Sequence, residues 1–398
     1  AKETAKEAAA REKMQQSEET AVAAMREASR KMTPRQRAIA ILNQISSRFP
    51  IMIYGTVERI DGLTLDSFVR GIDPDSWRDF MPKGVSVKLF QRIKHFYRED
   101  IFVATAKAIV ERLRRADELP VNERVSEIAD ILADFCYPDR ETVLTPWRTI
   151  NRQLADTLGG YCFYDETFKQ RLNEPRFVYN GDVTERLFMN PKARILDISS
   201  KTGLYSLYSA YSIYKLRSGQ SQGLFDTLSD AEAEALWKEI VENNIFALCR
   251  THIAESITRR TLLGYRTGIR VNVKRIDELN SLVMVYKRKF IRTVTNGKDF
   301  WKVNNNEQMK FDAIIGNPPY QVNIGEQKDN YGIPLYNQFV EIAREMKPNY
   351  ISMIMPSRWF TGGRGLDNFR RMMLADRRMR SIYDYVDSKD LFPTVDIS

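Results

Sequence analysis

A short stretch at the end of one apolar run holds the residues with the most distinctive chemistry. The sequence "FDAIIGNPPYQ", residues 311–321, predicts a buried strand that ends at Asn317. Pro318 and Pro319 fix two backbone φ angles and remove two N–H donors, which leaves the Pro318 carbonyl as an acceptor. The side-chain oxygen of Asn317 adds a second acceptor, and Tyr320 offers a ring for stacking. Two acceptors can hold both protons of one exocyclic amine and leave its lone pair free, so this pattern predicts alkylation of a planar amine without a metal.

A second strand end lies about 120 residues upstream, in "ARILDISSKTGLYSLYSAYSIYKL". A strand over residues 193–196 delivers Asp197 to its carboxyl end, and a short polar turn with Gly203 leads into a helix. Such a turn is typical of nucleotide-type cofactor loops, because backbone can approach the ligand and an acid can accept its amine or hydroxyl protons. Lys201 stands where a glycine-rich loop would have glycine. An ordinary strand-to-helix turn is therefore an equally open interpretation.

The elements around both stretches follow one pattern. After about residue 140, short runs rich in β-branched residues alternate with helical stretches, which indicates a parallel sheet with helices on both faces. Ligands of such sheets bind outside the carboxyl ends of the strands. The strands that we expect lie at 193–199, 244–249, 268–273, 311–316, 350–356 and 381–386.

The residues before about 139 have a helical pattern throughout. Residues 1–50 are rich in Ala, Glu, Lys and Arg and are expected to form an N-terminal helical linker. Within them Thr33 is a candidate N-cap, with Pro34 at the first helical position. Residues 51–138 are expected to form a helical domain, and residues 139–398 a third unit.

Composition excludes several classes of protein. The chain has 398 residues, of which 43% are hydrophobic and 28% are charged, enough for two or three domains with cores. We find no run that could cross a membrane and no signal peptide, so we expect a cytoplasmic protein. Three widely spaced cysteines and two histidines indicate neither disulfides nor a metal site.

The excess positive charge of +9 is uneven along the chain. Residues 245–310 contain 14 Lys and Arg against 5 Asp and Glu. This stretch is a candidate for facing phosphates, and a solvated face of ordinary helices is the alternative. Arg358 and Arg364, close after an expected strand end, are the candidates for contacting DNA phosphates.

The residues described above resemble those of a known family. Asn-Pro-Pro-Tyr after an apolar strand resembles the catalytic motif of S-adenosylmethionine-dependent amino-methyltransferases, above all the adenine-N6 DNA methyltransferases. "ILDISSKTG" resembles the family's cofactor motif, and "ETVLTPWRTINRQLADTL" resembles the Thr-Pro segment that packs over the methionine end of the cofactor. "PLYNQFVEIAREMKPNYISMIMPSRWF" and "LFPTVDIS" resemble later segments, so that the likeness covers roughly residues 135–398.

The resemblance implies an α/β fold, with a Rossmann-like methyltransferase sheet, helices on both its faces and an all-helical domain before it. It also implies roles for single residues. One departure is that Cys249 and Arg250 stand where an acid for the ribose is expected. The implied catalytic residues are Asn317, Pro318, Pro319 and Tyr320, and the implied S-adenosylmethionine-binding residues are Thr145, Pro146, Asp197, Ser199, Thr202, Gly203 and, for the adenine end, Asp277.

The mechanism implied by the resemblance is a direct displacement on double-stranded DNA. The target adenine leaves the duplex, its amine is held by Asn317 and the Pro318 carbonyl, and its ring stacks on Tyr320. The unit 139–398 is expected to lack its last strand and a target-recognition domain. The unit 51–138 resembles the coupling segment of single-chain restriction-modification enzymes, which implies partners on the same parent polypeptide or complex: a helicase-like motor, a nuclease and a target-recognition domain.

Two other functions stay open at this point. An RNA or protein-glutamine amino-methyltransferase can use the same tetrapeptide. A catalytically idle, DNA-binding coupling module is compatible with the unusual cofactor turn. No Gly-x-x-x-x-Gly-Lys-Ser/Thr loop is present, so an ATP-driven motor is expected outside this chain.

Overall fold

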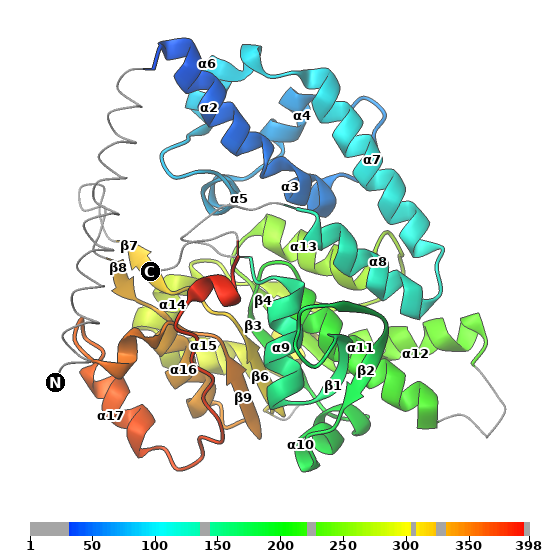
Figure 1. Ribbon diagram of the computed structural model, residues 1–398, viewed down its shortest axis with the longest axis vertical. Coiled ribbons are helices and arrows are strands. Elements are labelled where there is room, and N and C mark those ends of the chain that lie inside the picture. Colours follow the sequence, from blue (N-terminus) through cyan, green and yellow to red (C-terminus); the bar gives the residue numbers. More distant parts are fainter. Residues whose placement is uncertain (1–31, 136–143, 221–227, 304–307, 324–331, 394–398) are drawn as a thin grey trace.

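A five-stranded sheet forms the centre of the structure, a computed structural model that describes residues 32–135, 144–220, 228–303, 308–323 and 332–393 (Figure 1). Its strands follow the order β5-β4-β3-β6-β9, and every neighbouring pair is parallel. The expected parallel sheet is therefore confirmed. The strands are β3 (Ile195–Ser200), β4 (Ile245–Cys249), β5 (Asn272–Arg275), β6 (Ala313–Gly316) and β9 (Tyr350–Met353).

β3 and β6 are neighbours at the point where the strand order reverses. From β3 the chain proceeds to β4 and β5 on one side, and then returns to β6 on the other side of β3. The connections leave β3 and β6 in opposite directions, which is the position where sheets of this kind bind ligands. Asp197 of β3 pairs in register with Ile315 of β6. Asp197 is the third residue of β3, which continues to Ser200, so the predicted strand over residues 193–196 with Asp197 at its end is wrong in its bounds. Asp197 nevertheless lies on the strand next to the one that ends before Asn317.

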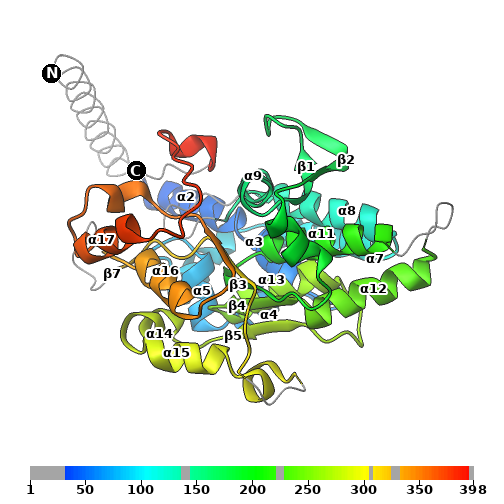
Figure 2. The ribbon, with the colours of Figure 1, turned by 90° about the horizontal axis from the view of Figure 1, so that it is seen from below.

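Helices cover both faces of the sheet, as Figure 2 shows. Alternate strand residues, such as Ile195 and Ile315, join a core with one set of helices, whereas Leu196 and Ile314 join a second core with the other set. The first set is α9 (Trp147–Thr157), α11 (Leu204–Gln220), α12 (Asp230–Asn243) and α13 (His252–Leu263), and the second is α14 (Leu279–Val285), α15 (Lys287–Val294) and α16 (Tyr336–Glu345).

The described residues before about 139 form an all-helical region, as expected. Thr33 caps the first described helix and forms a capping box with Gln36, with Pro34 at the start, so the predicted N-terminus is confirmed. Residues 1–31 of the expected linker lie outside the described part. The helices of this helical segment are α2 (Pro34–Ser46), α3 (Phe49–Thr56), α4 (Leu65–Arg70), α5 (Pro74–Phe80), α6 (Val87–Ile93), α7 (Glu99–Asp117) and α8 (Val121–Ala133), with a short turn η1 (Lys94–Phe96).

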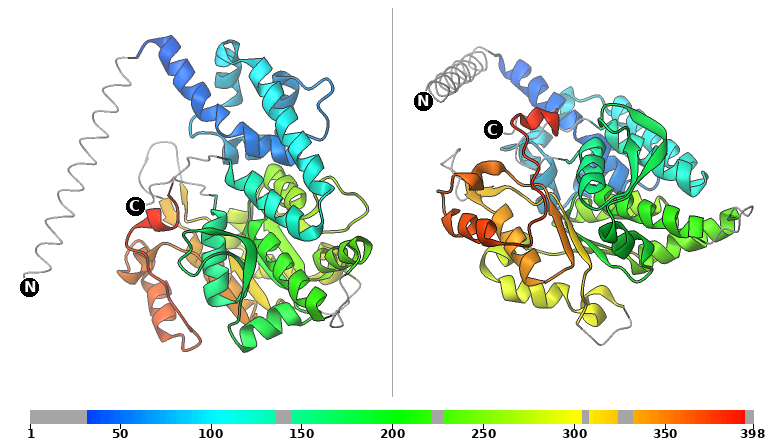
Figure 3. Two further views of the ribbon diagram at one scale, coloured as in Figure 1. Left: turned by 45° about the vertical axis from the view of Figure 1, so that its right-hand side comes forward. Right: turned by 60° about the horizontal axis from the view of Figure 1, so that its bottom comes forward.

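The helical segment packs directly on α13 (Figure 3). A Cβ on Gly55 of α3 would lie 2.5 Å from the Ile257 side chain, so the two helices can approach this closely only with glycine there. The Tyr54 hydroxyl hydrogen-bonds Thr261 Oγ1 at 3.0 Å. The apolar residues of the helical segment and of this sheet face belong to one continuous core. The helical segment is thus joined firmly to the sheet.

Smaller elements complete the described chain, and no described helix is long and apolar enough to span a bilayer. Two antiparallel hairpins flank the sheet, and the tip of the second lies outside the described residues. These elements are β1 (Gly160–Tyr164), β2 (Arg171–Val178), α10 (Asp182–Thr184), η2 (Glu185–Met189), η3 (Gly297–Trp301), β7 (Gln321–Asn323), β8 (Gly332–Pro334), η4 (Ser357–Phe360), α17 (Asp367–Ala375) and η5 (Ser388–Asp390).

The strand expected at 381–386 is wrong. Those residues have no strand conformation, and the Val386 side chain is exposed. Alternating apolar and polar residues predict a half-buried strand. Here the segment contacts α9 and does not pair with a strand of the sheet. The guanidinium of Arg152 lies 4.6 Å from the Tyr385 ring centroid, and Arg148 Nη2 donates to the Asp390 carbonyl at 2.7 Å. These contacts hold the segment against α9 instead of the sheet edge.

Strand β5 begins at Asn272, four residues later than expected. Side-chain contacts occupy the residues before it. The backbone N–H of Arg270 donates to Glu242 Oε1 at 3.0 Å, and Arg270 Nη1 donates to the Lys302 carbonyl at 2.9 Å. The apolar run therefore begins as a connection and becomes a strand only where it reaches β4.

Candidate active site

Asn317 follows the last residue of β6 and has one partnered and one unpartnered atom. Its Nδ2 donates a hydrogen bond to Thr145 Oγ1 at 3.1 Å. Its Oδ1 is buried and accepts no hydrogen bond from the described protein atoms. A buried acceptor without a donor is costly, and such an atom marks a place where a ligand can supply the donor. The free atom here is an oxygen, the kind of atom that an amine N–H requires.

The rest of the tetrapeptide lines the same strand end. Pro318 is buried, and Pro319 and Tyr320 are half-buried. Burial raises the pKa of the Tyr320 hydroxyl far above its usual value, and a hydrogen bond with Asn317 opposes this only in part. Tyr320 is therefore a neutral aromatic side chain at any ordinary pH. Its carbonyl accepts from Leu335 N–H at 3.0 Å, which fixes its backbone where the β7–β8 hairpin begins.

Asp197 of β3 lies beside this strand end and is only 2% exposed. Gly316 has a φ of 145°, and a Cβ there would come within 3.2 Å of Asp197 Oδ1. Asp197 Oδ1 accepts weakly from Ser199 N–H at 3.4 Å, whereas Oδ2 is buried and has no partner among the described residues. Burial raises the pKa of Asp197 to about 7, against smaller opposing contributions from hydrogen bonds with Ser200 and Ser199. The site thus contains an acid that changes charge near neutral pH.

The turn after β3 is pressed against α13. Gly203 has a φ of 77°, and a Cβ there would lie 3.1 Å from the Cα of Thr258, so this position requires glycine. The Thr202 carbonyl accepts from Thr261 Oγ1 at 2.6 Å. Ser200 Oγ and Thr258 Oγ1 are 3.1 Å apart. The turn is therefore held rigidly in the compact form that a cofactor loop needs.

Sequence reasoning missed Tyr205, a buried residue of α11. Its hydroxyl donates to Gln153 Oε1 at 2.6 Å. Burial raises the pKa of Tyr205 well above its usual value, the nearby Asp197 and Tyr320 add to this, and a hydrogen bond with Thr145 opposes it. Tyr205 therefore lies among Asp197, Tyr320 and Thr145, three residues that were predicted to belong to the site. The spacing of the tyrosines in α11 indicates only a buried helix face, so no signal in the sequence singles it out.

Lys201 and Arg250, the residues that depart from the cofactor motif, contact the same carboxylate. Lys201 in the turn and Arg250 after β4 both form salt bridges with Asp79 of α5. Asp79 belongs to the helical segment and is 4% exposed. The helical segment thus reaches the carboxyl ends of β3 and β4.

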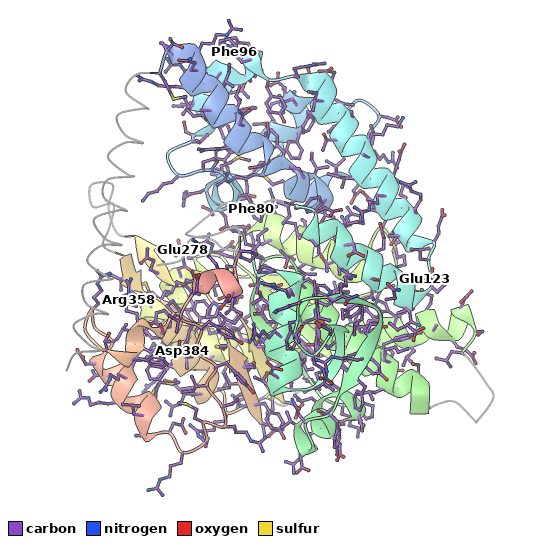
Figure 4. The ribbon with its side chains drawn as sticks, in the orientation of Figure 1. Phe80, Phe96, Glu123, Glu278, Arg358 and Asp384 are labelled. Atoms are coloured by element: carbon purple, nitrogen blue, oxygen red, sulfur yellow. The ribbon has the colours of Figure 1, made fainter. Side chains whose placement is uncertain are left out.

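Three of the predicted residues lie away from this cluster. Asp277 follows β5, two strands from β3, where it is exposed and pairs with Arg275 Nη2 at 3.0 Å. Arg358 in η4 and Arg364 shortly after it are exposed and follow β9. Figure 4 shows Arg358 at the outer side of the sheet domain. These arginines lie at the carboxyl end of an edge strand, beyond the tetrapeptide.

Part of the basic stretch 245–310 lies at the opposite end of the sheet. Arg270 and Lys302 line a cavity of about 530 Å³ together with Lys192 and Arg194, which precede β3. This cavity is at the amino ends of the strands, whereas Asn317 is at the carboxyl end. The charge there does not contribute to the site around Asn317.

The residues around Asp197 and the turn after β3 fit S-adenosylmethionine, the cofactor that the resemblance implies. Asp197 Oδ2 is a buried acceptor that has no partner in the described structure. Gly203 has no side chain, so the backbone of the turn is accessible at close range. Both features suit a ligand with hydroxyl and amine groups that approaches the backbone closely. In the described part of the chain, no group of three His, Cys, Asp or Glu could hold a metal ion.

Two comparisons match the sequence of this chain to known proteins. Residues 243–392 match the sequence model of the family described as Eco57I restriction-modification methylase. A relative from Mycoplasma pneumoniae, described as an uncharacterized adenine-specific methylase, is 26% identical over 302 residues, which cover 62% of this chain and 67% of the relative.

Among the similar solved structures is one described as a DrdV–DNA complex. It aligns with a TM-score of 0.38 and 14% identity over 86% of this chain. The aligned part is 32% of the other chain, so the present chain spans about a third of that protein. The family match contains Asn317 but begins after Asp197. The two sequence matches support the expected enzyme class, a DNA adenine methyltransferase of restriction-modification type.

Proposed function

We propose that this chain transfers a methyl group from S-adenosylmethionine to the N6 amine of adenine in double-stranded DNA. The observation that carries the proposal is a pair of buried oxygens, Asn317 Oδ1 and Asp197 Oδ2, that have no hydrogen-bond partner in the described part of the chain. One oxygen suits the amine of a base and the other suits a cofactor, and the two strands that carry them are adjacent. The family and relative matches support the same reaction.

The chain's own residues would hold and orient the base. Asn317 Oδ1 and the Pro318 carbonyl accept the two amine protons, so that the nitrogen lone pair stays directed at the incoming methyl group. Tyr320 stacks on the adenine ring after the base has left the duplex. S-adenosylmethionine, when bound, supplies a methyl group that is already strongly electrophilic. Positioning by these residues would therefore supply most of the catalysis.

The cofactor would lie against the turn after β3. We assign its contacts to Asp197, Ser199, Thr202 and Gly203, with Thr145 and Pro146 at its methionine end and Asp277 as the candidate for its adenine end. Arg358 and Arg364 would contact phosphates of the DNA.

We also propose a larger enzyme around this chain. Residues 1–50, 51–138 and 139–398 would act as linker, coupling domain and methyltransferase, in the cytoplasm. A helicase-like motor, a nuclease and a target-recognition domain on the same parent polypeptide or complex would complete a restriction-modification or phage-defence enzyme. An RNA or protein-glutamine substrate and a catalytically idle coupling module are the alternatives.

Sequencing of DNA from cells that express the full parent protein tests the proposal, by a method that detects N6-methyladenine. Wild-type protein should leave a methylated motif, and Asn317→Ala should abolish methylation while DNA affinity stays nearly unchanged. Asn122→Ala, an exposed position on α8, is the matched control and should methylate normally. If DNA stays unmethylated with wild-type protein, or methylation survives Asn317→Ala, the proposal is wrong.

A further inference from the structure

A buried carboxylate of the helical segment lies between two cations at the cofactor end of the sheet. Lys201 Nζ lies 3.4 Å from Asp79 Oδ1 and 3.3 Å from the Asp79 carbonyl oxygen. Arg250 Nη2 donates to the same Oδ1, and Thr251 Oγ1 donates to Oδ2 at 3.4 Å. A single side chain of α5 thus engages the ends of β3 and β4.

Neighbouring contacts hold α5 in this position. Lys201 Nζ lies 4.6 Å from the centroid of the Phe80 ring, a cation–π contact. The backbone N–H of Ile253, in the first turn of α13, donates to Ser76 Oγ at 3.1 Å. Phe80 lies where the helical segment meets the sheet domain (Figure 4). Lys201, although it belongs to the cofactor turn, is therefore directed at the helical segment.

The charges of this cluster depend on one another. Burial alone would raise the pKa of Asp79, but Lys201 and Arg250 outweigh it and hold that pKa below its usual value. Asp79 is therefore ionised at neutral pH. A buried ion cluster that loses one partner leaves an uncompensated charge behind, so the remaining side chains must move toward water. Lys201 itself belongs to the turn between β3 and α11, so a side chain released from Asp79 would stay at the turn where the cofactor is proposed to bind.

We propose that the helical segment controls cofactor binding through Asp79, which holds Lys201 and Arg250 against α5 and so keeps the turn after β3 open for S-adenosylmethionine. This inference rests on the proposed function. It explains how a lysine can occupy the position of a loop glycine without blocking the loop. Asp79 is in this view a positioning residue that acts through Lys201.

Reciprocity follows from this arrangement. If docking of α5 favours cofactor binding, then cofactor binding must favour docking of α5 by the same factor. The helical segment and the cofactor turn therefore form one coupled unit. A partner that pulls on the helical segment would lower the cofactor affinity.

A double-mutant cycle on the full-length protein tests the inference, with the dissociation constant for S-adenosylhomocysteine measured by calorimetry. Asp79→Asn should weaken binding by about tenfold, a typical coupling factor. Lys201→Ala alone should bind at least as tightly as wild type. Because Lys201→Ala removes the side chain that Asp79 restrains, Asp79→Asn should cost much less in that background. A purely structural role of Asp79 would cost the same in both backgrounds and would overturn the inference.

Two further measurements separate the outcomes. Asp75→Asn, on the same helix but exposed and paired with Arg78, is the control and should bind like wild type. Hydrogen exchange of wild-type α5 should slow when S-adenosylhomocysteine is added, and this readout needs no variant to fold. Unchanged exchange would contradict the coupling. If wild-type protein does not bind S-adenosylhomocysteine at all, the proposed function fails and this inference with it; if it binds but is indifferent to Asp79→Asn, only the inference fails.

Discussion

Asn317 and Thr145 come from segments more than 170 residues apart, yet the Nδ2 of the amide donates to the threonine hydroxyl at 3.1 Å. This contact decides which end of the amide remains free. With Nδ2 bound to Thr145, Oδ1 is the amide atom that has no partner within the described segments. We therefore propose that Thr145, which was expected to bind the cofactor, orients the amide.

Thr145→Val should lower the rate of methyl transfer. Valine has nearly the shape of threonine but offers no acceptor, so the Asn317 amide loses the bond that fixes its orientation. A hydrogen bond of this kind contributes about 1–1.5 kcal/mol, which corresponds to a roughly tenfold loss in kcat. Steady-state assays with radiolabelled cofactor would measure this loss.

Thr145→Ser is the matched control for that change. Serine keeps the hydroxyl and should retain most of the wild-type kcat, while both variants should keep the wild-type KM for DNA. If Thr145→Val raises only the KM for the cofactor, then Thr145 contacts the cofactor and does not orient Asn317.

Gly316→Ala should destabilise the fold. The added Cβ would lie 3.2 Å from Asp197 Oδ1, and the φ of 145° is unfavourable for any side chain. Strain of this kind costs about 1–3 kcal/mol. Urea unfolding would measure the loss of stability. Gly219→Ala, in α11 with nothing within 4 Å of the new Cβ, is the control and should be neutral or slightly stabilising.

The sequence was sufficient to predict the sheet because its strands are short apolar runs bounded by turns. β4 and β6 are buried along their whole length. In such strands a continuous apolar run in the sequence corresponds to a strand in the interior of the sheet. The segment 381–386 has a similar pattern but packs elsewhere. Its position depends on contacts with α9, which the local sequence does not encode.

The site could be predicted only where one strand end carries its own chemistry. Asn317 follows an apolar run, and the rule for parallel sheets places such a residue at the carboxyl edge of the sheet. Asp197 lies within β3, and its position beside that edge comes from the pairing of β3 with β6. Asp79 lies in a helix 122 residues before Lys201, in a segment with no motif. Its role depends on docking of the helical segment. The sequence therefore reveals that Lys201 stands in place of a loop glycine, but not that Asp79 pairs with it.

Arg358→Ala and Arg364→Ala should each weaken DNA binding without sequence preference. Both arginines are exposed after β9, and a phosphate contact contributes through release of counterions. Each change should reduce the slope of log affinity against log salt by about one. Fluorescence anisotropy of labelled duplex DNA with the full parent protein at several salt concentrations would measure the slopes. Arg377→Ala, exposed after α17, is the control, and an equal effect there would indicate a general charge effect.

The stability of the protein should fall as pH rises through neutrality, because of Asp197. Burial raises its pKa to about 7, from 3.8 for an exposed group. Between these values the folded protein keeps the proton that the unfolded chain has lost, so the stabilising contribution is complete below about pH 4 and is lost as pH approaches 7. Asp197→Asn has the same shape and no proton to lose. Between pH 5 and pH 8, the free energy of unfolding of wild type should fall by about 2–3 kcal/mol relative to that of Asp197→Asn. Urea unfolding of both proteins at the two pH values measures this difference, and parallel behaviour would show that Asp197 is ionised throughout. The affinity of wild type for S-adenosylhomocysteine should change in the opposite sense and rise between pH 5 and pH 8. The reason is that the ionised carboxylate is the better acceptor for hydroxyl and amine protons. The affinity of Asp197→Asn should show no such rise.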